Sequence, residues 1–261
     1  DVALLVEGFD VQDSYSRVSP ATAPAKLSEK LKLAIPKQLE FFGDTQSADA
    51  FQQALLQLKN LGAEITEIDF SAFNQLASQL YQGSWVAERT AAVADLLETS
   101  AQDFDPTVLE IIQKGKQYSA VDTYRAEYLK QDLARNIQQT LAQFDALVVP
   151  SSPTIHTLAE MAEAPIENNS HFGTYTNFTN LADLSAIAVP AGFRADGLPF
   201  GITLIAPAWH DAALADFAQT WQQHLQLPLG AINKKWPESS RAISAPSAQH
   251  FRVAVVGAHL T

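Results

Sequence analysis

The sequence contains no cysteine, which excludes disulfide bonds, thiolate metal sites and cysteine nucleophiles. Glycine is also scarce, with 11 in 261 residues, below the usual share of about 7%. Neither a GxGxxG nor a Walker pattern occurs in the chain. Because nucleotide phosphates are usually held by such glycine-rich loops, nothing in the sequence supports nucleotide binding, and no cofactor is expected.

Long apolar runs are missing as well. No stretch approaches the roughly 18 consecutive apolar residues that a membrane span needs, and the start, DVALLVEGFD, lacks the basic flank of a secretory signal. We therefore expect a cytoplasmic protein with no membrane partner. The formal net charge of −12 disfavours nucleic acid and anionic lipid as partners and is otherwise typical of a soluble protein.

Metal-ligand patterns are absent from the histidines. No two of them are three to five residues apart, so no helical pair of imidazole ligands is predicted. We expect no metal site. The six histidines are His156, His171, His210, His224, His250 and His259.

The ends of the chain do not resemble natural termini. Residue 1 is Asp, the single methionine is Met161, and the last residues, FRVAVVGAHLT, have the pattern of a strand that enters a turn. We expect the chain to be a fragment. With 47% hydrophobic and 18% charged residues it is nevertheless long enough to bury a core.

The first half of the chain predicts an α/β protein. The turn-rich start leads to a strand at LKLAIP that ends at Pro36. Apolar residues then recur at spacings of three and four over 45–61, which predicts a helix with Gly62 at its end. AEITEIDF alternates apolar and polar residues and predicts a second strand. A strand, a helix and a strand in succession are typical of a sheet with helices packed on it.

Helices are predicted next, followed by strands. The helical regions are 71–100, a short helix opened by Asp105 and Pro106, and 119–144, with Val121, Tyr124, Tyr128, Leu129 and Leu133 on one stripe. DALVVP predicts a strand buried on both faces of a parallel or mixed sheet. AIAVPAGF and FGITLIAP predict a hairpin through the Asp-Gly pair in RADGLP. A last helix is predicted over 211–225, and the Pro-, Ser- and Ala-rich stretch after it indicates a linker.

Two serine pairs are candidate nucleophiles. Ser151 and Ser152 follow the strand DALVVP, and Ser239 and Ser240 lie in the linker. A nucleophilic serine needs a base within hydrogen-bond reach and backbone donors for the oxyanion. Proline on both sides of the first pair removes one such donor, and no G-x-S-x-G pattern occurs. The favoured interpretation of Ser151 and Ser152 is a structural turn at the end of a strand.

The stretch LYQGSWVAER, residues 80–89, places a Gly-Ser pair inside a predicted helix. Gly83 costs roughly 1 kcal/mol against alanine in a helix interior, so a break is expected there. A break would free carbonyl groups near Tyr81. Two interpretations of Arg89 remain open. It forms an exposed ion pair with Glu88, or its guanidinium binds a carboxylate in bidentate fashion.

Several stretches together resemble the later half of an amidase-signature hydrolase, and within that family its allophanate hydrolase branch. They are LYQGSWVAERTAAV, FDALVVPSSPTIHT and GTYTNFTNLADLSAIAVPAGFRADGLPFGITLIAP. The resemblance implies an amidase-signature fold, present here in part, with a mixed sheet flanked by helices in three α/β/α layers. It assigns 1–230 to the amidase domain, 231–249 to a linker, and 250–261 to the first strand of a C-terminal domain.

The same resemblance implies hydrolysis of allophanate, urea-1-carboxylate, to ammonia and carbon dioxide in urea degradation. Arg89 is implied to hold the carboxylate of this small substrate, and Tyr81 to help position it. The family's Ser, cis-Ser, Lys triad belongs to the earlier half of the domain, so we expect no catalytic residue in this chain. Lys26, Lys30 and Lys32 are followed by no partner serine motif and are not candidates for the triad lysine.

The implied partners are a biotin-dependent urea carboxylase that acts before this enzyme and a second copy of the chain in a homodimer. Two other functions remain open: a general amidase of the same superfamily with another substrate, and a non-catalytic binding or assembly module on the amidase scaffold. In each case the fragment alone is expected to be inactive.

Overall fold

The computed structural model describes residues 8–228. The predicted linker 231–249, the predicted strand in 250–261 and the serine pair Ser239 and Ser240 lie outside the described residues. The chain divides into two compact units, one of Asp1–Ala23 with Pro228–Thr261 and one of Pro24–Leu227. In the first unit, residues 8–23 form turns, as predicted from the sequence. The helices and strands that follow belong to the second unit.

A five-stranded mixed sheet forms the centre of this unit, in the order β2-β1-β3-β5-β4. β1 is parallel to β2 and β3, and β5 is antiparallel to β3 and β4. All five residues of β3 are buried, as predicted for a strand covered on both faces. The α/β class with a mixed sheet is therefore confirmed. The strands are β1 Lys32–Pro36, β2 Glu64–Ile68, β3 Ala146–Pro150, β4 Leu184–Phe193 and β5 Pro199–Pro207.

The predicted hairpin connects β4 and β5. Gly197 has a φ of +83°, which glycine adopts without steric cost. Its N–H donates to the Arg194 carbonyl at 2.9 Å, and the Arg194 N–H donates to the Leu198 carbonyl at 2.8 Å. The Asp-Gly pair thus turns the chain at the predicted place.

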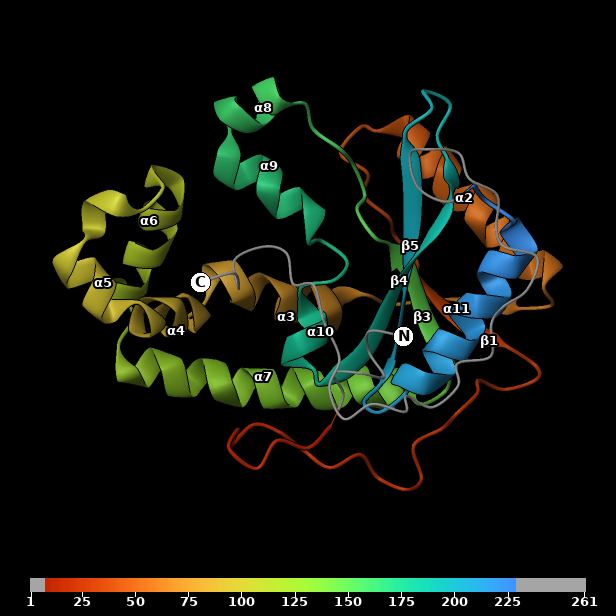
Figure 1. Ribbon diagram of the computed structural model, residues 1–261, viewed down its shortest axis with the longest axis horizontal. Coiled ribbons are helices and arrows are strands. Elements are labelled where there is room, and N and C mark those ends of the chain that lie inside the picture. Colours follow the sequence, from red (N-terminus) through yellow and green to blue (C-terminus); the bar gives the residue numbers. More distant parts are fainter. Residues whose placement is uncertain (1–7, 229–261) are drawn as a thin grey trace, which may run out of the picture. The chain divides into compact units, whose positions relative to one another are not determined.

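Helices cover both faces of the sheet (Figure 1). On one face, α2 Thr45–Asn60 and α11 Asp211–Leu225 enclose a core that contains Phe51 and Trp221, both fully buried. On the other face, α3 Ser71–Gln82, α7 Ala120–Leu141 and α10 Phe178–Leu181 enclose a second core. Burying a large apolar side chain contributes about 1.5–3 kcal/mol, so these two cores hold the three layers together.

Capping residues set the helix ends where the sequence predicted them. Asp44 accepts a hydrogen bond from Ser47 N at the start of α2, and Gly62, just beyond its end, has a φ of +90°. Asp105 caps α6, Pro106–Gln113, whose first residue is proline. Ser119 and Asp122 form a capping box at the start of α7.

Two expectations about the helices differ from the structure. The helical region 71–100 is three helices, α3, α4 Trp85–Ala92 and α5 Ala94–Thr99, with a second interruption at Val93. Between Ser151 and Asp183 the structure adds three unforeseen helices, α8 Leu158–Glu163, α9 Pro165–Phe172 and α10. These are at most eight residues long, too short to show a clear apolar period. Two 3₁₀ turns complete the unit, η1 Ala101–Asp103 and η2 Lys114–Gln117.

The predicted apolar stripe of α7 is wrong over its first half. Val121, Tyr124 and Tyr128 are all more than half exposed. Leu129, which belongs to the predicted stripe, and Ala126, which does not, face α3 across a small pocket. Because α7 carries two apolar stripes, its periodicity alone does not determine which of them packs inward.

Candidate functional site

The α3–α4 elbow, residues 82–85, is where the predicted helix break occurs. α3 ends at Gln82, Gly83 is extended with φ −110° and ψ −178°, and α4 begins at Trp85. A Cβ atom at Gly83 would lie 2.6 Å from the backbone oxygen of Gln79, closer than real Cβ atoms approach. Glycine is therefore required here by a close backbone contact and not by its φ angle.

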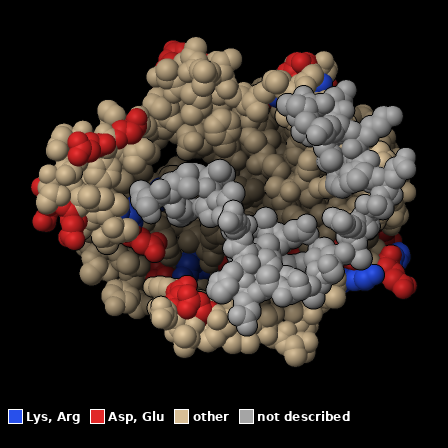
Figure 2. All heavy atoms as spheres, viewed as in Figure 1, with Lys and Arg blue, Asp and Glu red and all other residues tan. Residues whose placement is uncertain are grey.

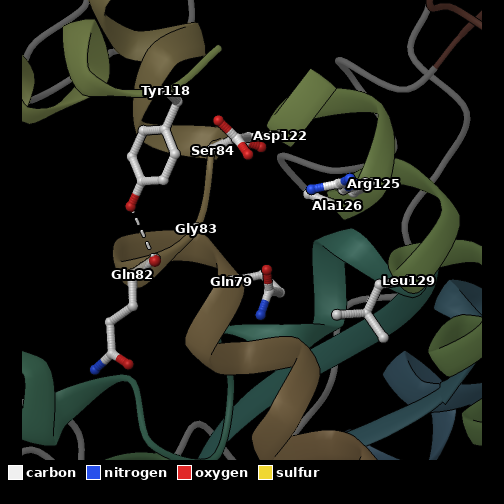
Figure 3. Close-up of a pocket in the computed structure, with 9 residues that line it drawn as sticks. All are labelled: Gln79, Gln82, Gly83, Ser84, Tyr118, Asp122, Arg125, Ala126 and Leu129. Atoms are coloured by element: carbon white, nitrogen blue, oxygen red, sulfur yellow. Dashed lines mark hydrogen bonds between the residues drawn. The ribbon is translucent and has the colours of Figure 1, made fainter. Parts of the chain in front are cut away.

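The break frees a backbone carbonyl, as expected. The Gln82 carbonyl accepts a hydrogen bond from the Tyr118 hydroxyl at 3.0 Å, which Figure 3 shows as a dashed line beside the turn at Gly83. Ser84 is only 6% exposed at this point. The elbow is thus tied to the segment before α7 rather than left open to solvent.

The elbow brings the two predicted site residues together. In a continuous helix their backbones would be roughly 12 Å apart along the axis. With the helix broken, the Arg89 guanidinium carbon lies 4.5 Å from the centre of the Tyr81 ring. This is a cation–π contact, in which the positive guanidinium faces the electron-rich ring. Tyr81 is 38% exposed and Arg89 is half-buried.

Arg89 has no acidic partner among residues 8–228. Within residues 8–228 no carboxylate lies within salt-bridge distance of its guanidinium, and the expected alternative, an ion pair with the neighbouring Glu88, does not form. In the same residues its N–H groups make no hydrogen bond to protein. A guanidinium that is held over an aromatic ring, and whose N–H groups have no protein acceptor, can bind a planar carboxylate with two parallel hydrogen bonds.

Three contacts fix α4, the helix that carries Arg89. The Thr90 hydroxyl donates to the Ile112 carbonyl at 2.6 Å. Gly115 of η2 packs so closely on α4 that a Cβ there would lie 2.0 Å from the Thr90 oxygen and 2.8 Å from Ala87 Cα. On the other side, the Lys130 ammonium lies 5.6 Å from the centre of the Trp85 ring.

Acidic side chains gather over α5 and α6 (Figure 2). The segment 94–113 contains five carboxylates and no lysine or arginine. The carboxylates are Asp95, Glu98, Asp103, Asp105 and Glu110. Arg89 thus precedes a segment of negative charge but contacts none of these groups within the described residues.

Sequence reasoning missed a buried arginine. The Arg194 side chain, 7% exposed, contacts the Asp44 carboxylate at 2.6 Å, the Asp196 carboxylate at 2.7 Å and the Ser47 hydroxyl at 2.9 Å. The hydrogen bond to Asp196, and then the bond to Asp44, raise the pKa of Arg194. No sequence signal links Asp44 with Arg194, because 150 residues separate them.

The pKa of Asp44 is held below its ordinary value. Burial by itself would raise this pKa, but it is outweighed by the hydrogen bonds from the Ser47 backbone and hydroxyl and by the charge of Arg194. Asp44 also accepts a hydrogen bond from Thr154 at 3.2 Å. This cluster therefore joins α2, the loop after β3 and the β4–β5 turn.

A second missed feature is a histidine pair. His156 Nε2 lies 3.0 Å from His171 Nδ1, and the His171 ring stacks on Phe42 with centres 3.8 Å apart. The two histidines are 15 residues apart, which no helical ligand pattern predicts. Among residues 8–228 no group of three or more histidine and carboxylate side chains is placed to hold a metal ion.

Ser151 and Ser152 are in structural roles. The Ser151 hydroxyl lies 2.9 Å from that of Thr203, and the Ser152 hydroxyl donates to the Thr154 carbonyl. Neither is hydrogen-bonded to a lysine, histidine or carboxylate within the described part of the chain.

No helix in residues 8–228 has the length and hydropathy of a membrane span.

Comparison with known sequences gives a family match. The profile of the family described as Amidase matches residues 2–215. Urea amidolyase of Saccharomyces cerevisiae is 40% identical over 260 residues, which is 95% of this chain and 14% of that protein. The chain thus spans about one seventh of the length of this curated relative.

Solved structures agree with the sequence match. An allophanate hydrolase from Kluyveromyces lactis superimposes with a TM-score of 0.79 and 40% identity, over 83% of this chain and 36% of that one. The urea amidolyase of K. lactis gives a TM-score of 0.81 at 40% identity, over 84% of this chain and 13% of that one. The mixed sheet and its helical layers are therefore shared with these enzymes.

Proposed function

This chain belongs to the amidase family, and on that premise we propose that it supplies substrate recognition in an allophanate hydrolase. The reaction is hydrolysis of the amide bond of allophanate, urea-1-carboxylate, to ammonia and carbon dioxide in urea degradation. Arg89 binds the substrate carboxylate, and Tyr81 helps to position the substrate. In this proposal the serine nucleophile and its lysine lie outside residues 1–261.

The observation that carries the proposal is the arrangement of Arg89. Its guanidinium is held over the Tyr81 ring at 4.5 Å and has no carboxylate neighbour within the described residues. Holding a half-buried cation without a protein counterion costs solvation energy. A bound carboxylate would recover that energy. The similarity to the K. lactis allophanate hydrolase supports the choice of substrate.

The chemistry assigned to these two residues is binding and orientation. The fork of Arg89 places two N–H donors in one plane, which fits both oxygens of a carboxylate and fixes the plane of the substrate. Tyr81 limits rotation of the guanidinium. Orientation of this kind lowers the entropy cost of bringing the amide carbon to a nucleophile.

The test is the substitution R89A in the intact gene product. Hydrogen bonds to a charged group contribute about 1.5–3 kcal/mol, so the KM for allophanate should rise by roughly tenfold to a hundredfold. Ammonia release measured against allophanate concentration gives this value. Simple aliphatic amides, which lack the carboxylate, should be poor substrates of the unmodified protein.

The matched control is R135A, which removes an exposed arginine of α7 that makes no ion pair within residues 8–228. Its KM should stay at the unmodified value. Unchanged kinetics in R89A, or efficient hydrolysis of simple amides, would contradict the proposed substrate. Absence of ammonia release by the intact protein would favour a binding or assembly module.

Two partners belong to the same proposal. A biotin-dependent urea carboxylase produces allophanate and acts before this enzyme, and the similarity to urea amidolyases supports that order. The chain also forms a homodimer. Light scattering of the purified intact protein at twice the monomer mass is the expected result, and a monomer at micromolar concentration would exclude the dimer.

A further inference from the structure

A polar pocket adjoins Tyr81, and we call it the Tyr81 pocket. It has a volume of about 190 Å³ and lies between α3 and the residues that lead from α9 into α10. Figure 1 shows α10 beside α3. Tyr81 thus both lies under the Arg89 guanidinium and lines this pocket. The lining residues are Asn74, Ala77, Ser78, Tyr81, Gln82, Ser170, Gly173, Thr174 and Asn177.

The serine and threonine hydroxyl groups in this lining are already engaged. Ser78 donates to the Gln75 carbonyl at 2.8 Å, Ser170 to the Glu167 carbonyl at 2.6 Å, and Thr174 to the His171 carbonyl at 2.8 Å. Each of these hydroxyl groups donates its only proton to a backbone carbonyl and has none left to donate to a ligand. The donors that remain for a ligand are the side-chain amides and the Tyr81 hydroxyl.

Asn177 stands apart among these amides. Its carboxamide makes no hydrogen bond to the part of the chain that the structure describes, and its side chain does not cap α10. Asn74 and Gln82 also lack such bonds and are exposed, whereas Asn177 is half-buried. The amide atoms of Asn177 are not among the buried, unsatisfied side-chain atoms of residues 8–228, so they are open to a ligand that enters the pocket.

The backbone holds this amide in place. Asn177 N donates to the Gly173 carbonyl at 3.0 Å. A Cβ at Gly173 would lie 2.2 Å from Asn177 Oδ1 and 2.4 Å from Nδ2. The Asn177 carboxamide therefore folds back over Gly173, into space that is open because residue 173 has no side chain.

We propose that Asn177 is a specificity-determining residue that binds the ureido end of the substrate. This inference rests on the proposed function, in which Arg89, oriented by Tyr81, binds the carboxylate end. A carboxamide offers two N–H donors and one acceptor oxygen, and the ureido group presents the complementary carbonyl and N–H groups. Asn177 thereby distinguishes a ureido carboxylate from a carboxylate that has no N–H groups.

The experiment compares two ligands of the same shape in the intact gene product. Allophanate is the substrate, and acetoacetate, which has the same heavy-atom framework without N–H groups, is a competitive inhibitor. N177L keeps the volume of the side chain and removes its hydrogen bonds. The KM for allophanate should rise about tenfold, while the inhibition constant for acetoacetate, which keeps the carbonyl but has no N–H groups, should rise by a clearly smaller factor.

A second variant, G173A, displaces the amide without removing it and should raise the KM for allophanate by a smaller factor. The control N136L alters an exposed asparagine of α7 and should change neither constant. Circular dichroism of each variant shows whether the fold is kept. The inference would be overturned by an unchanged KM for allophanate in N177L. It would also be overturned if the KM for allophanate and the inhibition constant for acetoacetate rose by the same factor.

R89A separates this inference from the proposed function. If R89A binds both ligands more weakly while N177L keeps both the KM for allophanate and the inhibition constant for acetoacetate, the role of Asn177 is overturned. Carboxylate binding by Arg89 then still stands. No change for either ligand in R89A overturns the proposed function, and the role of Asn177 with it.

Discussion

At the residue scale, the ring of Tyr81 is the surface that keeps the Arg89 guanidinium in one orientation. A cation–π contact at a partly exposed site contributes about 0.5–1 kcal/mol, which is small beside the hydrogen bonds to a bound carboxylate. Its effect is on orientation, since a guanidinium held over a ring has fewer directions in which to present its planar fork of donors. Ring and hydroxyl of Tyr81 therefore have separable roles.

Tyr81 can be tested with two substitutions. Y81F keeps the ring and should leave the KM for allophanate within about twofold of the unmodified value if orientation of Arg89 is the main role. Y81L removes the ring and should raise the KM about threefold to fivefold, because the guanidinium regains rotational freedom. Steady-state ammonia release in the intact protein measures both values.

The comparison between the two variants is its own control. A rise in the KM for allophanate in Y81F as large as in Y81L would assign the effect to the hydroxyl, in direct contact with substrate, and would contradict the orienting role.

Gly83 is a residue-scale feature of a different kind. It lets the chain pass the Gln79 carbonyl, and without that passage Tyr81 and Arg89 would stay a helix turn or more apart.

At the element scale, α4 is positioned by short contacts rather than by a large apolar face. One of its residues, Val86, is fully buried. The helix instead packs on η2 at Gly115 and bonds through Thr90 to the end of α6. A helix of eight residues is not stable by itself in water, so these contacts determine where Arg89 lies.

The substitution G115A tests this dependence. The added methyl group would meet Thr90 and the α4 backbone at 2.0 Å and 2.8 Å, so α4 and η2 must separate. Overpacking of this kind costs typically about 1–3 kcal/mol, and the displaced Arg89 should raise the KM for allophanate. Thermal denaturation and ammonia release of the intact protein measure the two effects.

K116A, at an exposed position of the same 3₁₀ turn, is the control and should change stability by less than about 0.5 kcal/mol. If G115A melted at the unmodified temperature and kept its KM, close packing on η2 would not be what positions α4.

At the scale of the whole molecule, Arg194 joins three distant segments. It bonds to Asp44 and Ser47 at the start of α2, while Asp44 also accepts from Thr154 after β3. Removing one partner from a buried pair leaves an uncompensated charge and costs about 3–5 kcal/mol. This cluster closes the end of the sheet where α2 begins.

R194M should therefore destabilise the protein by about 3 kcal/mol near neutral pH. Since the pKa of Asp44 is lowered in the folded state, its stabilising contribution is present above the unfolded pKa. That contribution is lost as pH falls through the lower folded pKa. The difference between R194M and the unmodified protein should then shrink below about pH 4.

Urea denaturation of the intact protein between about pH 7 and pH 3 measures this difference. R194K keeps the positive charge but not the guanidinium fork that reaches two carboxylates. Its free energy of unfolding should therefore lie between those of R194M and the unmodified protein. A difference that stays constant over the whole pH range would show that packing, and not the ion pair with Asp44, is what Arg194 contributes.

The predictable parts of this protein are those set by local chemistry. Asp105 with Pro106, the Asp196-Gly197 turn and the uniformly apolar β3 each carry their structural signal within a few residues. The break at Gly83 was predictable for the same reason. The short helices α8 to α10 were not, because fewer than three turns cannot show a period.

The candidate site divides in the same way. The resemblance to the amidase family singles out Tyr81 and Arg89, but their contact depends on how far the chain turns at the elbow, which no spacing specifies. The pocket beside Asn177, and the partners of Arg194 and of the two paired histidines, follow from chain segments that approach one another in the folded protein. Their roles become visible only when burial and hydrogen bonding are known for each atom.

The sequence by itself determined the α/β class, the strand order along the chain, the hairpin and the family. The fold features followed because period, turn residues and caps act over a few neighbouring positions, and the family followed from the resemblance of several stretches. Tertiary structure alone decided which stripe of α7 faces inward, that Arg89 lies on Tyr81 and not against Glu88, and that Arg194 reaches Asp44. Those outcomes depend on packing and desolvation between distant segments, and these energies exist only once the layers have assembled.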